Sequence, residues 1–231
     1  MNTPLRRISL PALAAALGLG LATAVAPSAV AGGAFWTPVP LGHLQVTSGA
    51  VTTLRSGLLE TRSPQMRAVE LDAGRHAQWA RLRFRYRQPS DATATLGSGA
   101  IRRQIGLKLE AGDPCNLLYA MWWEYPVHQI AISVRRNPGQ RTSSACGNRG
   151  YSEVAMIPLP IPAAALDHRA HTLEAHNRHE IDGALTLVVA ADGRVVYDDR
   201  LPAGLAADLD GPIGVRSDNG VYHFALSAGH R

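Results

Sequence analysis

Apolar and polar residues alternate with a period of two along much of the chain. In residues 79–87 the even positions are apolar, and the odd positions carry Trp79 and four arginines: Arg81, Arg83, Arg85 and Arg87. Residues 104–110 and 129–135 alternate in the same way. Because successive side chains of a strand point to opposite faces, each of these segments is predicted to form a half-buried β-strand.

The segment between two of these strands, residues 117–125, is apolar on both faces. A strand that is covered on both sides lies in the middle of a sheet, so this segment is predicted to be a central strand. Three such strands follow one another with short connections, which indicates an antiparallel meander.

The C-terminal third shows further strand patterns that are separated by turn signals. Strands are predicted at 171–177, 184–190, 194–197, 211–215 and 221–226, with turns at Asp192-Gly193 and at 217–220. The only predicted helix is short, at 163–166. It follows the proline-rich segment 158–162, which lacks the amide donors that a central strand needs. Many short strands over about 200 residues predict an all-β fold, a two-sheet antiparallel β-sandwich.

The N-terminus has the three-part pattern of an export signal. Arg6 and Arg7 precede an apolar stretch at 10–25, and Ala29-Val30-Ala31 offers small residues for cleavage. We therefore expect residues 1–31 to be a secretory signal peptide and residues 32–231 to form one domain that is secreted, periplasmic or in the cell envelope. A membrane anchor is the alternative, and the arginine pair leaves the Sec and twin-arginine routes open. No later segment approaches the roughly 18 apolar residues of a membrane span, so no membrane is expected after cleavage.

Charge and composition exclude some classes of partner. The 23 basic and 18 acidic residues give a net charge of +5, which falls to +3 when Arg6 and Arg7 leave with the signal. A nucleic-acid partner is not expected, because the chain has no dense run of lysine and arginine. With 46% hydrophobic and 18% charged residues, the composition is that of a globular protein rather than a disordered one.

The two cysteines, Cys115 and Cys146, are predicted to form a disulfide in an exported protein. The loop of about 30 residues that they close would stabilise the fold by about 3 kcal/mol through restriction of the unfolded chain. Two sulfurs alone do not make a zinc site, and the spacing is not that of a Cys-x-x-Cys redox pair.

The end of the chain resembles a known fold family. The sequence from 184 to 197, followed by Gly211-Pro212-Ile213-Gly214-Val215-Arg216-Ser217-Asp218-Asn219, resembles the closing strands of concanavalin A-like (laminin-G-like) jelly rolls. The block 115–151 is similar to exported bacterial proteins of unsettled activity. The resemblance implies a two-sheet sandwich whose concave sheet often meets glycans, an architecture that lectins, glycosidases and alginate-type polysaccharide lyases share. Fold does not decide among these activities.

Enzymatic sites on this architecture need residues that the chain offers only in part. A glycosidase needs two carboxylates. Glucanases of this architecture carry Glu-x-Asp-x-Glu, whereas Glu70 and Asp72 are followed by Gly74 at the third position. A lyase needs a base and a group that neutralises a carboxylate. The candidate lyase residues are Tyr125, His128 and Gln129. Their order differs from the Gln-hydrophobic-His motif of alginate-type lyases.

Metal ligands are present but are not predicted to converge. His168, His171, His176 and His179 have neighbouring carboxylates and suit zinc. On a strand, however, His171 and His176 point to opposite faces, so no metal site is predicted from them. Calcium remains an alternative, and no other cofactor is expected. The residues that could bind calcium through oxygen are also the residue types that turns favour. These donors are Asp192, Asp198, Asp199, Asp208, Asp210, Asp218 and Asn219.

Two surfaces are candidates for ligand binding. The first is the face of Trp122, which, if it points outward, presents the side chains of Asn116, Trp122, Glu124 and, from neighbouring strands, Lys108, Gln129, Ser133 and Arg135. The alternative is that Trp122 and Trp123 both lie in the core. The second surface is the face of Arg81, Arg83 and Arg85. Their like charges repel unless they meet counterions, acidic neighbours or an anionic ligand.

These patterns predict a secreted β-sandwich domain that binds a glycan or cell-wall polymer without catalysing a reaction, with an acidic polysaccharide as one candidate ligand. A polysaccharide lyase or other glycan-active enzyme that uses the concave sheet is the first alternative. A structural envelope protein is the second. The sequence does not indicate the oligomeric state.

Overall fold

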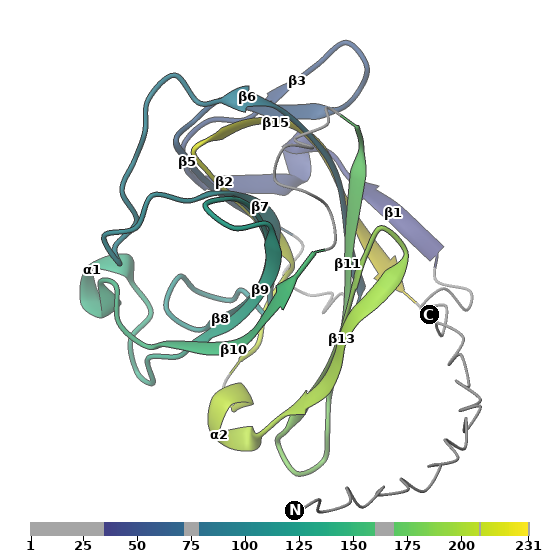
Figure 1. Cartoon of the computed structure of the whole chain (residues 1–231). Coiled ribbons are helices and arrows are strands. Elements are labelled where there is room, and N and C mark those ends of the chain that lie inside the picture. The colour runs from purple at the N-terminus through teal and green to yellow at the C-terminus, as the bar shows by residue number, and fades with distance from the viewer. Residues whose placement is uncertain (1–34, 72–78, 160–168, 208, 231) are drawn as a thin grey trace, which may run out of the picture.

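The computed structural model describes residues 35–71, 79–159, 169–207 and 209–230, and most of them lie in two antiparallel sheets that pack face to face (Figure 1). Along sheet A the order is β13 (Arg194–Leu201), β12 (Leu185–Ala191), β11 (His171–His179), β6 (Trp79–Pro89), β15 (Gly220–His230), β4 (Leu59–Thr61) and β3 (Thr52–Thr53), with β1 (Phe35–Val39) also paired to β15. Along sheet B the order is β10 (Tyr151–Pro158), β9 (Gln129–Arg135), β8 (Leu117–Tyr125), β7 (Arg103–Leu109), β14 (Gly214–Asp218), β5 (Gln65–Glu70) and β2 (Leu44–Ser48). The predicted β-sandwich is confirmed.

Helices in the described part of the chain are single turns in connections. A 3₁₀ turn, η1 (Leu41–His43), precedes β2; α1 (Ser143–Cys146) lies between β9 and β10; α2 (Ala203–Ala206) follows β13. None of them has the length and apolar character that crossing a membrane requires. The signal peptide predicted at 1–31 and the helix predicted at 163–166 lie outside the described residues.

The alternating segments form the strands that their patterns predict. The predicted boundaries at 117–125 and 129–135 match β8 and β9, and β7, β8 and β9 form the expected meander with β8 in its centre. Pro158 ends β10 at the edge of sheet B, where a missing amide donor removes no ladder bond to a further strand. The strand predicted at 211–215 begins only at Gly214. The carbonyl oxygens of Pro212 and Ile213 accept hydrogen bonds from the backbone amides of Ala111 and Glu70, outside the pairing of β14.

The core lies between the sheets and is built from the apolar faces of both. Trp122 is 1% exposed and packs edge-on against Phe84 of β6, with ring centroids 5.4 Å apart. Its indole Nε1 donates to His128 Nε2 over 2.9 Å, which satisfies the one polar atom of the ring. Burial of an aromatic side chain of this size stabilises the fold by about 1.5–3 kcal/mol. The condition that the Trp122 face points outward is therefore not met, because the ring packs against Phe84 of the opposite sheet.

A disulfide joins Cys115 to Cys146, as predicted. Cys115 lies just before β8, and Cys146 is the last residue of α1. The bond therefore ties the β9–β10 connection back to the start of the central strand.

Glu124, which follows the same parity as Trp122, also points into the sandwich. It is 7% exposed, and its Oε2 accepts a hydrogen bond from the Tyr222 hydroxyl over 3.2 Å. Burial raises the pKa of Glu124 to about 8, because removal from water disfavours the carboxylate.

This burial makes stability depend on pH. The unfolded carboxyl ionises near its ordinary pKa of 4.5, whereas the folded one keeps its proton to about 8. Stability is therefore fully present below pH 4.5 and falls as pH rises through 8, by a few kcal/mol at about 1.4 kcal/mol per pKa unit. Glu124→Gln should melt close to the wild type near pH 5 and at a higher temperature near pH 9, measured by thermal unfolding. A difference in melting temperature that stays constant across this range would contradict the assignment.

Candidate functional site

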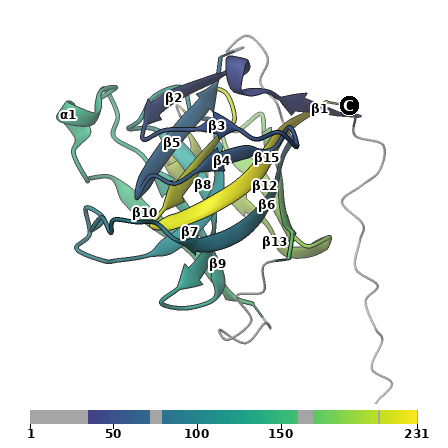
Figure 2. The same cartoon turned by 90° about the horizontal axis from the view of Figure 1, so that it is seen from above.

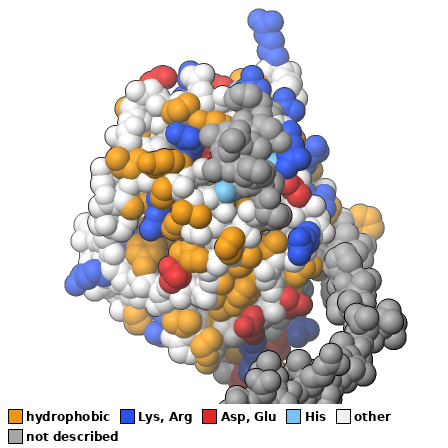
Figure 3. Space-filling model, viewed as in Figure 1, with side chains coloured by type: hydrophobic (Ala, Val, Ile, Leu, Met, Phe, Trp, Pro, Cys, Tyr) orange, Lys and Arg blue, Asp and Glu red, His pale blue; other side chains and the backbone are white. Residues whose placement is uncertain are grey.

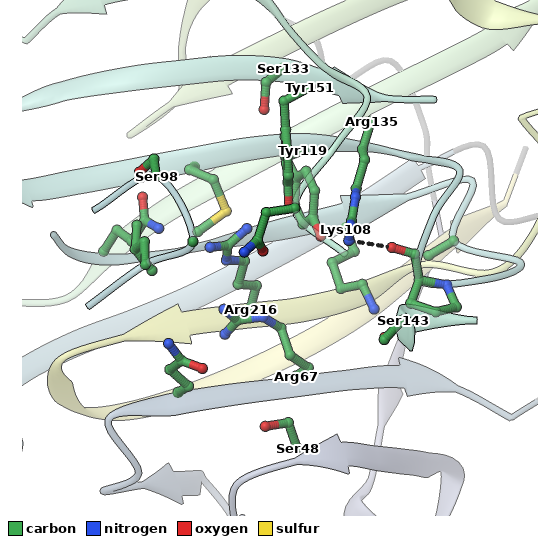
Figure 4. A pocket seen from close by; sticks show the side chains of 18 of the residues that line it. Ser48, Arg67, Ser98, Lys108, Tyr119, Ser133, Arg135, Ser143, Tyr151 and Arg216 are labelled. Atoms are coloured by element: carbon green, nitrogen blue, oxygen red, sulfur yellow. Dashed lines mark hydrogen bonds between the residues drawn. The ribbon is translucent and has the colours of Figure 1, made fainter. Parts of the chain in front are cut away.

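The outer face of sheet B forms a groove of about 830 Å³ that runs from β2 to β10. Its floor comes from the strand positions that point away from the sandwich core. They include Arg67 on β5, Lys108 on β7, Tyr119, Met121 and Trp123 on β8, and Arg216 on β14. Figure 4 shows that Arg67, Lys108, Arg135 and Arg216 project into the same space.

A buried carboxylate organises two of these cations. Arg67 and Arg216 are direct cross-strand partners, an arrangement that repels unless an anion lies between them. Asp218, which is fully buried, supplies that anion: its Oδ1 lies 2.7 Å from Arg67 Nη2 and its Oδ2 lies 2.9 Å from Arg216 Nε. Gln104 Nε2 also donates to Oδ2 over 2.5 Å. Although burial alone would raise it, the two guanidiniums hold the pKa of Asp218 below its ordinary value.

Lys108 has no acidic partner among the residues that the structure describes. It is 5% exposed, and its ammonium group makes no hydrogen bond or ion pair with those residues. Its cross-strand neighbours are Tyr119 and Gly214, so on the β14 side the neighbouring position carries no side chain. Burial lowers the pKa of Lys108 to about 7, and the charges of Arg67 and Arg216 act in the same direction.

The aromatic rings of the groove lie beneath guanidinium groups. Arg102 lies 3.9 Å from the ring centre of Trp123, Arg216 lies 5.1 Å from that of Tyr119, and Arg135 lies 4.9 Å from that of Tyr151. These are cation–π distances. Trp123 and Tyr119 are correspondingly only 7% and 4% exposed. The faces of these rings are therefore covered by cations.

The residues of the first predicted surface do not lie together in the structure. Lys108, Ser133 and Arg135 line the groove, but Trp122 and Glu124 lie in the core. The guanidinium of Arg135 donates hydrogen bonds to the carbonyl oxygens of Pro114, Gly147 and Arg149. Gln129 lies at the other end of β9, outside the groove lining, where its Nε2 donates to Met156 Sδ. Asn116 is buried and bonds to Asp113 and to the backbone of Gln140.

The second predicted surface lies on the other sheet. The face of Arg81, Arg83 and Arg85 is the outer side of sheet A, so it does not join Lys108 in one site. Arg81 Nε lies 2.7 Å from Glu174 Oε1, as the acidic-neighbour alternative expected, and its guanidinium lies over the ring of Trp36 at 3.8 Å. Arg83 and Arg85 are exposed.

The candidate lyase residues lie outside the groove lining. Tyr125 is half exposed, and His128 Nε2 accepts a hydrogen bond from the indole N–H of Trp122. Of the hydrolase candidates, Glu70 ends β5, and Asp72 and Gly74 lie outside the described residues.

The histidines do point to opposite faces of β11, as predicted from parity. His171 lies on the core side with its Nδ1 2.8 Å from Asp192 Oδ2, whereas His176 stacks on Trp79 with ring centroids 4.1 Å apart. His168 lies outside the described residues, and within them no three metal-binding side chains of His, Cys, Asp and Glu converge. Asp218, one of the calcium candidates, is occupied by its arginine partners.

Sequence reasoning missed most of the groove. Parity places Tyr119 and Trp123 on one face, but nothing in the sequence marks that face as the outer one. The missed cations are Arg67, Arg102 and Arg216, which come from three distant segments. On the face drawn in Figure 3, basic side chains are scattered among hydrophobic, acidic and uncharged ones.

No protein-family model and no curated protein matches the sequence. Solved structures do match in fold. The carbohydrate-binding module CBM66 from Bacillus subtilis has a TM-score of 0.57 at 12% identity, covering 82% of this chain and 96% of that one. A β-glucanase from Bacillus licheniformis has a TM-score of 0.51 at 12% identity, covering 87% of this chain and 99% of that one. The chain therefore has the concanavalin A-like jelly-roll fold that its closing strands resemble.

The environment of Lys108 predicts that this residue destabilises the protein. An unfolded lysine keeps its proton to its ordinary pKa of 10.5, whereas folded Lys108 releases it near 7. The loss of folding stability caused by Lys108 is therefore complete below pH 7, and it becomes smaller as pH rises towards 10.5. Lys108→Met, which retains the apolar stem, should raise the melting temperature near pH 6 by an amount equivalent to a few kcal/mol, and less near pH 9.5. A lower melting temperature of the variant near pH 6 would show that Lys108 has a structural partner instead.

Proposed function

We propose that this protein binds an acidic glycan in the groove of sheet B. The observation that carries the proposal is Lys108, a lysine that is only 5% exposed, lines the groove and lies beside Arg67 and Arg216; its ammonium group makes no hydrogen bond or ion pair among the described residues. A buried charge is retained at a cost unless an opposite charge reaches it. A carboxylate or sulfate group of a ligand supplies that charge.

The charge balance of the groove supports an anionic ligand. Five basic side chains line it, from Arg67, Arg102, Lys108, Arg135 and Arg216, against two acidic ones, from Asp113 and Glu153. Asp218 beneath them neutralises one further charge. Guanidinium groups bind carboxylate and sulfate through paired, charge-assisted hydrogen bonds that are stronger than contacts to neutral hydroxyls.

The shape and the remaining lining support a glycan as the carrier of that anion. The groove crosses most of the sheet, and its walls offer hydroxyl groups suited to sugar hydroxyls, from Thr47, Ser48, Ser98, Ser133 and Ser143. One protein of the same fold is described as a carbohydrate-binding module, which agrees with this use of the architecture.

We also propose that the protein acts outside the cytoplasm, in the secreted fraction, periplasm or envelope. The disulfide supports this, because such bonds persist in oxidising compartments. Detection of the processed chain beginning at Gly32 in the exported fraction tests it.

The proposal is tested with a panel of soluble polymers and two matched variants. Wild-type protein should bind at least one of alginate, polygalacturonate and chondroitin sulfate, and should not bind neutral dextran or laminarin. Lys108→Met should weaken this binding about tenfold to a hundredfold, since a hydrogen bond to a charged group contributes about 1.5–3 kcal/mol. Arg83→Ala combined with Arg85→Ala removes exposed charges from the opposite sheet and should leave affinity unchanged. Calorimetry measures all three proteins.

Other outcomes identify the alternatives. Loss of binding in the Arg83/Arg85 variant with normal binding in Lys108→Met would transfer the site to the outer face of sheet A. Shortened products with an unsaturated terminal sugar, seen by mass spectrometry, would establish a lyase. No binding to any acidic polymer would remove the proposed function.

A further inference from the structure

Two long connections lie at opposite ends of the strands of sheet B. Residues 90–102 lead into β7, and residues 136–150 lead from β9 through α1 into β10. Both β7 and β9 are antiparallel to β8, so they run in the same direction. The connection before β7 and the connection after β9 therefore start at opposite ends of the strands. We call these two connections together the strap.

The two parts of the strap meet. A Cβ atom built on Gly97 would lie 2.0 Å from Cγ of Asn148, so only the absence of a side chain at Gly97 permits this approach. Figures 1 and 2 both show the connection before β7 beside the α1 connection, on the open side of sheet B. Gly97, Ser98 and Asn148 line the groove together with the floor. The strap thus crosses the groove along the direction of the strands.

Both parts of the strap are held in place. Asn219 fixes the first: its Oδ1 accepts from the amide of Ala94 over 2.7 Å, and its Nδ2 donates to the carbonyls of Ala94 and Arg102, each over 2.9 Å. The second is fixed by the disulfide and by Arg135, which donates to the carbonyls of Gly147 and Arg149. These bonds oppose a swinging motion of either part.

The floor beneath the strap is covered although it faces away from the core. Lys108 and Met121 are 5% and 4% exposed, values typical of the interior rather than of one open sheet face. The groove nevertheless retains its volume of about 830 Å³. A ligand therefore reaches the space beneath the fixed strap by entering along the groove and not from above the strap.

From this geometry we infer that the groove admits an acidic polysaccharide by a free, unbranched chain end and does not bind the middle of a long chain from the side. The inference rests on the proposed function and specifies its ligand. A polymer lying across the outside of the strap does not reach Lys108, whereas a chain end passing under the strap does.

The test compares long and short chains of equal mass. Alginate, polygalacturonate and chondroitin sulfate are each titrated intact and after partial hydrolysis, with the number of chain ends measured by a reducing-end assay. For the polymer that binds, the number of binding sites per gram should rise in proportion to the number of ends, so that doubling the ends doubles the sites. A number of sites per gram that stays constant as the ends multiply overturns the inference and leaves the proposed function standing. Absence of binding by both preparations of all three polymers overturns both.

Opened straps provide the matched comparison. Asn148→Gly removes the exposed side chain that contacts Gly97, and Cys115→Ser with Cys146→Ser releases the second part of the strap. Each should bind intact polymer at more sites per gram than the wild type. Ser144→Gly, on the same connection but outside the groove lining, should behave as the wild type. If the disulfide variant fails to fold, Asn148→Gly alone decides. Sites that remain proportional to chain ends in the opened strap would overturn the role assigned to it.

Discussion

The carboxylate of Asp218 is the interaction on which the candidate site depends. It joins β5 to β14 through Arg67 and Arg216, and it reaches β7 through Gln104. Without an anion between them, two cross-strand guanidiniums would repel at the middle of a sheet. Breaking a buried pair by removal of one partner costs about 3–5 kcal/mol, so the register of three strands and the position of two cations follow from one residue. Asp218 neutralises only one of the charges around it, and the remaining charge is available to a ligand.

Small residues and parity then determine where the cations point. Gly214 pairs with Lys108, and Gly106 pairs with Arg216, so each cation lies next to a position without a side chain. A Cβ at Gly106 would lie 2.2 Å from the carbonyl oxygen of Ala120, and one at Gly214 would lie 2.3 Å from that of Ala68. These close backbone approaches leave room for long basic side chains on the outer face of sheet B. The same face carries the aromatic rings, which the guanidiniums cover.

The sequence predicted the features of the fold that depend on residues close together along the chain, such as strand positions and the faces of their side chains. Alternation located β6 and β9, the apolar run between two alternating segments located β8, and parity correctly separated His171 from His176. It did not decide which face of β8 is the core, because residues 117–125 are apolar on both sides. Trp122 and Trp123 were therefore indistinguishable, and the answer depends on Phe84 of the other sheet. The short strands before residue 70 escaped prediction, since segments of two to six residues are too short to show a period.

The pairing of Arg67 with Arg216 and the meeting of Gly97 with Asn148 lay beyond sequence reasoning for a related reason. Each joins segments that are distant along the chain, and no local pattern contains their register.

The two basic faces of the sandwich differ in how their charges are balanced, and this difference is what distinguishes a binding site from ordinary sheet structure. On sheet A, Arg81 has Glu174 and the ring of Trp36, and Arg83 and Arg85 are exposed to water, so the protein and solvent accommodate the charge. On sheet B, Lys108 is only 5% exposed, and no acidic side chain is bonded to it among the described residues. An apolar side chain of the same length would be the more stable choice at that position. The proposed anionic ligand would supply the opposite charge that the described part of the fold does not place beside Lys108.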